Sequence, residues 1–141
     1  MPLYLLDTDS ASLFQRGEVA VRARVVATPP SDLGLTIITA EEQLRGRLSR
    51  IRRALTGPER VAAYAHLRRT VVFLVNLRLY DFDARAEEQF QTLRRAHRHT
   101  GVHDLRIAAI ALVNRAVLVT CNRRDFEAIA DLTIEDWSAA T

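Results

Sequence analysis

Short apolar runs alternate with helical patterns along this chain, and this alternation restricts the fold more than any other feature. The runs at residues 3–6, 33–39 and 116–120 are rich in Leu, Val, Ile and Thr, as buried strands are. Segments with apolar residues at helical spacing separate these runs. Strands that alternate with helices predict a mostly parallel sheet with right-handed crossovers. We therefore predict an α/β fold with three α/β/α layers.

The other elements follow from turn residues and helical spacing. Gly17, Pro29-Pro30 and Gly57-Pro58 interrupt the helical patterns. Thr8 or Asp9 is expected to cap the first helix, because short oxygen side chains accept hydrogen bonds from its free N–H groups. Helices are expected over residues 10–15, 18–27, 40–55, 58–77, 84–99 and 103–114, and further strands over 79–82 and 132–134.

Length and composition are those of a single globular domain, expected over residues 1–141. Apolar residues make up 48% of the chain and charged residues 26%, and no linker or repeat divides it. No apolar run approaches the ~20 residues that span a bilayer, and the start lacks the pattern of a secretory signal. The single cysteine, Cys121, excludes an internal disulfide, so we expect a cytoplasmic protein with Cys121 buried. Trp137 is expected to pack the last element onto the domain.

Polar side chains follow the predicted strands at the point where each strand ends. In an open α/β sheet the carboxyl ends of parallel strands share one edge, so these side chains can converge there. Asp104 instead begins a helix so apolar that it must be buried. The set comprises Asp7, Asp9, Glu41, Glu42, Asp104, Asn122 and Asp125.

Carboxylates gathered at one place repel one another, and a divalent cation removes that repulsion. Oxygen ligands without required Cys or His select hard ions such as Mg²⁺ or Mn²⁺. An ion of this kind can activate water and bind a scissile phosphate. All 20 basic residues are Arg, and eight of them lie in two clusters at 45–53 and 94–98. Such clusters suit a polyanion, although a solvated helix face explains them equally well. Without any Lys, neither a P-loop nor an aspartyl-phosphate site of the usual type can form. The predicted chemistry is metal-dependent hydrolysis of phosphodiester bonds.

Four blocks of sequence resemble the signature motifs of PIN domains, and most closely those of VapC-type toxins. The blocks lie at residues 5–9, 37–46, 104–109 and 118–126, in the family's order and across nearly the whole chain. The resemblance implies an endoribonuclease that depends on Mg²⁺ or Mn²⁺ and is the toxin of a bacterial toxin–antitoxin pair.

The resemblance assigns Asp7, Glu42 and Asp104 to three metal-binding acids of the family. Glu42 is favoured over Glu41 because the family places this acid three residues after a Thr and four before a Gly. Many PIN domains carry a fourth acid where this chain has Asn122, so that role stays open between Asn122 and Asp125. The catalytic set expected is Asp7, Glu42, Asp104 and Asp125, with Asp9, Asn122 and Asp125 acting on the metal through water or through its ligands, and with Arg45, Arg123 and Arg124 contacting RNA phosphates.

The same resemblance implies partners: an RNA substrate, a cognate antitoxin that holds the enzyme inactive, a second copy in a homodimer, and no membrane. An antitoxin segment is expected to lie along the first helices and the hairpin of residues 40–77, with contacts at Leu13, Phe14, Val25 and Leu48.

Three alternatives stay open. The amide at Asn122 suits a PIN-like module that binds RNA or protein without cutting it. A DNA nuclease of the same architecture would carry the same acids. His97, His99 and His103 with Asp104 could instead bind a transition metal, although residues two apart on a helix point away from each other.

Overall fold

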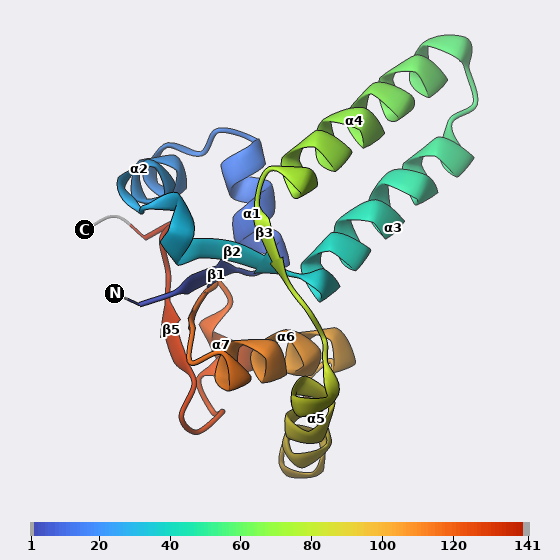
Figure 1. Ribbon diagram of the computed structural model, residues 1–141. Helices are drawn as coiled ribbons and strands as arrows, with labels where there is room; N and C mark the ends of the chain where they lie inside the picture. The colour runs from blue at the N-terminus through green and yellow to red at the C-terminus, as the bar shows by residue number, and fades with distance from the viewer. Residues whose placement is uncertain (1, 140–141) are drawn as a thin grey trace.

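The computed structural model describes residues 2–139, which form a central sheet of five parallel strands (Figure 1). The strand order β3-β2-β1-β4-β5 puts the first strand of the chain in the middle. Every neighbouring pair is parallel, which confirms the predicted parallel sheet. The strands are β1 (Tyr4–Leu6), β2 (Leu33–Thr36), β3 (Arg78–Tyr80), β4 (Val117–Val119) and β5 (Thr133–Glu135).

Helices cover both faces of this sheet. Leu5 and Leu6 point to opposite faces because side chains alternate along a strand. Leu5 packs with Phe90 beneath α5, α6 and α7, whereas Leu6 packs with Val21 and Leu74 beneath α1, α2 and α4. Figure 1 shows these layers, with α3 and α4 projecting as a hairpin, and so confirms the predicted three-layer fold. The helices are α1 (Thr8–Gln15), α2 (Val19–Ala27), the 3₁₀ turn η1 (Pro30–Asp32), α3 (Ile37–Arg53), α4 (Gly57–Val75), α5 (Ala84–Ala96), α6 (Val102–Val113) and α7 (Arg123–Phe126).

The second strand ends earlier than predicted. The apolar run at residues 33–39 was expected to be strand throughout, but β2 stops at Thr36 and α3 begins at Ile37. The cause is local: the Thr36 side chain caps the helix by accepting a hydrogen bond from the Thr39 backbone N–H at 3.1 Å. Glu42 therefore lies in the second turn of α3, further from the start of the helix than the predicted beginning at residue 40 implies.

Several smaller predictions are also corrected. α5 ends at Ala96, so His97 and His99 lie beyond the helix on which they were expected. Cys121 is exposed, because it lies in the turn after β4. Val25 is buried among apolar residues and cannot contact a partner.

Trp137 is buried as expected, with its ring 5.2 Å from that of Tyr4. Within residues 2–139 the structure has no helix that combines the length and the apolar character needed to cross a membrane.

Candidate active site

Asp7 lies at the middle of the site because it directly follows the central strand. Its backbone N–H donates to the Val119 carbonyl of β4 at 2.9 Å, which joins the ends of two strands. Its side chain accepts from the Ser10 backbone N–H at 2.8 Å and so caps α1, in place of the predicted caps Thr8 and Asp9. Only 5% of Asp7 is exposed. Burial raises the pKa of this carboxyl, and hydrogen bonds from Thr120 and Ser10 partly oppose that rise.

Glu42 is held by residues from two other helices. The Thr8 hydroxyl donates to Glu42 Oε1 at 2.5 Å, and His103 Nδ1 lies 3.3 Å from Oε2. Thr8 also lies within 3.3 Å of the Thr39 hydroxyl, so α1 and α3 are joined beside the acid. Its neighbour Glu41 instead pairs with Arg45 at 2.7 Å on the exposed side of α3. Of the two adjacent acids, Glu42 is the one that contacts both α1 and α6, whereas Glu41 lies 3.8 Å from His103 and contacts no residue of α1 among these bonds.

Asp104 shows that the acids are close enough to affect one another. It lies in the first turn of α6, a helix whose residues 107–111 are buried. Burial, followed by the charges of Asp125, Glu42 and Asp7, raises the pKa of Asp104 to about 6. The structure therefore brings together four acids that are up to 118 residues apart in the sequence.

Asn122 and Asp125 follow β4 and act as a pair. The Asn122 amide donates from Nδ2 to Asp125 Oδ2 at 2.5 Å. The Asn122 backbone N–H donates to the Thr120 hydroxyl at 3.0 Å, which fixes the start of the turn. The amide therefore orients a carboxylate whose charge acts on Asp104. In this arrangement Asp125 supplies the charge and Asn122 positions it.

The remaining predicted residues lie around this centre. Asp9 is exposed in the first turn of α1, and its charge contributes to the raised pKa of Asp7. Arg123 and Arg124 are exposed on α7, next to the Asn122–Asp125 pair. Arg45 is engaged by Glu41, so its guanidinium is less available than those on α7.

The carboxylates are within electrostatic range, but Asp7, Glu42 and Asp125 each have hydrogen-bond partners of their own. In residues 2–139, no three His, Cys, Asp or Glu side chains are gathered into a closed set of metal ligands. The alternative cluster of His97, His99, His103 and Asp104 is not formed in this part of the chain. His97 and His99 follow the end of α5, while His103 faces Glu41 and Glu42.

Sequence reasoning missed the contacts of Thr8 and His103 with Glu42, and the bond from Thr8 to the Thr39 hydroxyl. Thr39 is three residues before Glu42, a spacing that puts both on one helix face. That signal is visible only if α3 begins at Ile37, and the prediction of a longer strand concealed it. His103 was considered as part of a transition-metal cluster, and nothing in the sequence links it to Glu42.

Comparisons with known proteins agree with the fold. Residues 4–132 match the PIN domain family. The chain is 34% identical over 70 residues to Ribonuclease VapC2 of Rickettsia felis, a region that covers 47% of this chain and 52% of that relative, about half its length. It is similar to the DNA-bound VapBC from Salmonella typhimurium, with 27% identity, a TM-score of 0.79 and coverage of 97% and 99% of the two chains. It is also similar to VapBC-1 from nontypeable Haemophilus influenzae, with 25% identity, a TM-score of 0.77 and the same coverage.

Proposed function

Because this chain belongs to the PIN domain family, we propose that it is a metal-dependent endoribonuclease and the toxin of a toxin–antitoxin pair. One observation carries the proposal: burial, followed by the charges of Asp125, Glu42 and Asp7, raises the pKa of the Asp104 carboxyl to about 6. A structural role alone gives no reason to gather four acids from α3, α6 and the ends of two strands. Their repulsion opposes folding, so a function must maintain it.

The donor set fits a hard divalent cation, Mg²⁺ or Mn²⁺. All donors are oxygens, and a cation between them would relieve the repulsion that, together with burial, raises the pKa of Asp104. Asp7, Glu42 and Asp104 would hold the ion directly, while Asp9, Asn122 and Asp125 would act through water or through the other acids. Such an ion supplies a water of lowered pKa and neutralises charge on the phosphate.

The chain's own residues orient this site and bind the substrate. Ser10 and Thr8 fix one carboxylate oxygen each on Asp7 and Glu42, which pre-organises both acids. Arg123 and Arg124 stand exposed beside the Asn122–Asp125 pair, where they can donate to RNA phosphates. Arg45 is the weaker candidate, because Glu41 competes for it.

An antitoxin is the protein partner that we propose, supported by the likeness to two VapBC structures. Leu48 is 48% exposed on α3, and Leu13 and Phe14 are half-buried on α1, so these three residues can meet an apolar segment of that partner. The proposal includes a homodimer in the cytoplasm, a single domain over residues 1–141 and RNA as the substrate.

A binding module that does not cut is the second candidate, and Asn122 favours it. An amide there removes one negative charge from the family's usual set. The hydrogen bond from Asn122 to Asp125 argues for cleavage instead, because it holds a nearby carboxylate in the site.

The test is to incubate the purified, partner-free protein with single-stranded RNA and with DNA, in Mg²⁺, in Mn²⁺ and in EDTA. We expect RNA cleavage that EDTA abolishes and that Asp104→Asn removes without unfolding the protein. Binding of RNA without cleavage in either metal would support the module. Cleavage of DNA in preference to RNA would reassign the substrate.

A further inference from the structure

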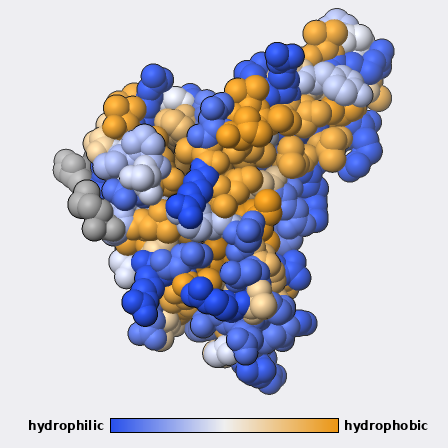
Figure 2. Space-filling model, in the orientation of Figure 1, coloured by the Kyte–Doolittle hydropathy of each residue, from blue (hydrophilic) through white to orange (hydrophobic). Residues whose placement is uncertain are grey.

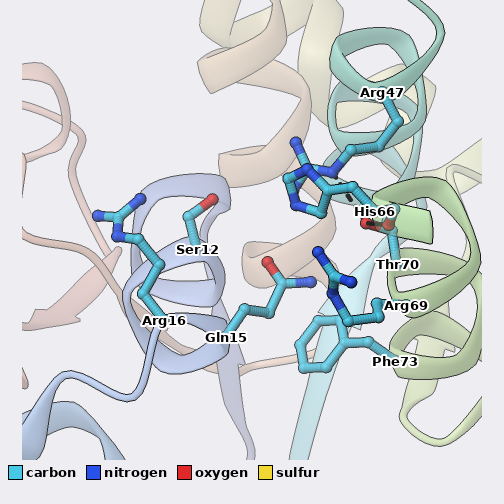
Figure 3. A pocket seen from close by; sticks show the side chains of 8 residues that line it. All are labelled: Ser12, Gln15, Arg16, Arg47, His66, Arg69, Thr70 and Phe73. Atoms are coloured by element: carbon cyan, nitrogen blue, oxygen red, sulfur yellow. Dashed lines mark hydrogen bonds between the residues drawn. The ribbon is translucent and has the colours of Figure 1, made fainter. Parts of the chain in front are cut away.

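A second concave site lies between α1 and the hairpin formed by α3 and α4 (Figure 3). Its volume is about 480 Å³. Figure 3 shows His66, Arg69 and Arg47 reaching from the hairpin toward Ser12 and Gln15 of α1, with Arg16 on the α1 side.

The site is rich in positive charge. Three arginines line it, Arg16, Arg47 and Arg69, and no carboxylate does. None of these three takes part in an ion pair within the described residues 2–139, whereas Arg24 and Arg45 do. Concentrated positive charge without a counter-charge in the protein attracts an anion.

Arg47 is held in place rather than free to move. Its Nε donates to the Thr70 hydroxyl at 2.8 Å, and Thr70 is only 2% exposed. The Thr70 hydroxyl in turn donates to the His66 carbonyl at 3.0 Å. The two terminal nitrogens of Arg47 are therefore left to donate, in the fork geometry that matches phosphate oxygens.

His66 adds a neutral donor to the same site. Its Nδ1 lies 2.7 Å from Arg50 Nη1, and an arginine can only donate, so Nδ1 accepts. Burial and the charges of Arg47, Arg50 and Arg69 lower the pKa of His66, which keeps the ring neutral. The proton then lies on Nε2, which can donate to an anion.

The position of the site relative to the acids favours RNA. α1 begins after Asp7 and α3 carries Glu42, and the Thr8–Glu42 hydrogen bond joins the two helices there. Ser12 lies five residues after Asp7, and Arg47 lies five residues after Glu42. Five residues correspond to about 7.5 Å along a helix axis. A strand with one phosphate at the acids can therefore extend others over this site. Phe73 in its lining offers a ring on which a base can stack.

We propose that Arg16, Arg47 and Arg69 bind neighbouring backbone phosphates of the RNA strand that the carboxylates cut. The inference rests on the proposed function, since it needs RNA at the acids. It adds a phosphate-binding site separate from Arg45, Arg123 and Arg124.

The test measures the affinity for a short single-stranded RNA against salt concentration, in an Asp104→Asn background that leaves the RNA intact. Each phosphate contact that is lost should lower the slope of log affinity against log salt by about 0.7. The double variant Arg16→Gln/Arg69→Gln leaves the Arg47–Thr70 bond in place and should lower the slope by about 1.4. The matched control is Arg52→Gln/Arg60→Gln, which removes the same charge near the hairpin tip and should leave the slope unchanged. Thermal unfolding by circular dichroism checks that both variants fold.

An unchanged slope in the double variant, or an equal fall in the control, would overturn the inference while RNA cleavage by the parent protein kept the proposed function intact. Competition supplies the other arm. An acidic peptide is added to displace the RNA from the parent protein. If it does so, and if the double variant no longer binds the peptide but keeps the salt slope of RNA binding, the site belongs to a protein partner. If the parent protein neither binds nor cleaves RNA, the proposed function fails with it.

Discussion

The Thr8 hydroxyl donates to Glu42 Oε1 at 2.5 Å and so joins the first turn of α1 to the second turn of α3. Thr8 follows Asp7 directly in the chain. Asp7 follows the central strand and caps α1, while Thr8 fixes Glu42, which is 35 residues from Asp7. The two acids are therefore positioned together, by neighbouring residues at the start of α1.

Thr8→Val should lower RNA cleavage about 10- to 100-fold, the usual cost of losing a group that orients a metal ligand. The valine keeps the shape of the threonine but cannot donate to Glu42. Thr8→Ser retains the hydroxyl and is the matched control, expected to stay within a few-fold of wild type. Initial rates at saturating Mn²⁺ make the comparison. Equal rates for Thr8→Val and wild type would mean that Glu42 needs no such support.

The raised pKa of Asp104 predicts how activity depends on pH. Below about 6 this carboxyl holds a proton, and a protonated acid is a poor metal ligand. Apparent affinity for Mg²⁺ should therefore fall as pH drops below about 6, on the order of tenfold per pH unit. Asp125→Asn removes the largest charge acting on Asp104 and should move its pKa down, which NMR titration can follow in the metal-free protein. A pKa unaffected by Asp125→Asn would place the two acids too far apart to share a site.

The same carboxyl links function to stability. The pKa of Asp104 is higher in the folded state than its unfolded value of 3.8. The contribution of this carboxyl to stability is therefore fully present below pH 3.8 and is lost as the pH rises through about 6. At neutral pH the metal-free protein therefore contains a destabilising charge. Asp104→Asn should raise the free energy of unfolding at pH 7 by about 1–2 kcal/mol, after a discount for partial exposure. Urea unfolding of the two proteins at pH 7 and at pH 4 tests this, and the difference should vanish at the lower pH.

Two substitutions of Asp7 separate its role as the cap of α1 from its proposed role as a metal ligand. Asp7→Ala removes the acceptor for the Ser10 N–H and should cost about 0.5–2 kcal/mol of stability, with complete loss of cleavage. Asp7→Asn keeps a capping oxygen, so it should lose cleavage while unfolding at nearly the wild-type temperature. Cleavage that survives in Asp7→Asn would remove Asp7 from the metal site.

The fold was largely predictable because it depends on patterns that lie within short segments. The apolar runs at β1 and β4 and the very apolar helix α6 are evident in the sequence, and alternation supplied the parallel sheet. The surface was harder to predict from the sequence. Figure 2 shows apolar residues on the outer surface over α4, whereas the pattern of apolar residues in the sequence would assign them to the core. Val72 and Val75 on that helix are 49% and 74% exposed.

The site was predictable only in part, for a physical reason. The acids Asp7 and Asp104 stand out because each adjoins a buried apolar segment. The residues that position the acids, Thr8, Thr39 and His103, do not stand out in the sequence. They come together only when folding brings α1, α3 and α6 into contact. The end of β2 illustrates the limit: Thr36 could continue a strand or cap a helix, and only its bond to the Thr39 N–H decides between them.

The most direct test of the account is the equilibrium binding of Mn²⁺ to the partner-free protein, followed by the electron paramagnetic resonance of the free ion. We predict saturable binding to the wild type and binding that is weaker by about tenfold or more in Asp104→Asn. Binding should stay close to wild type in the matched control Glu41→Gln, because Glu41 pairs with Arg45. Equal Mn²⁺ affinity in the wild type and Asp104→Asn would contradict it.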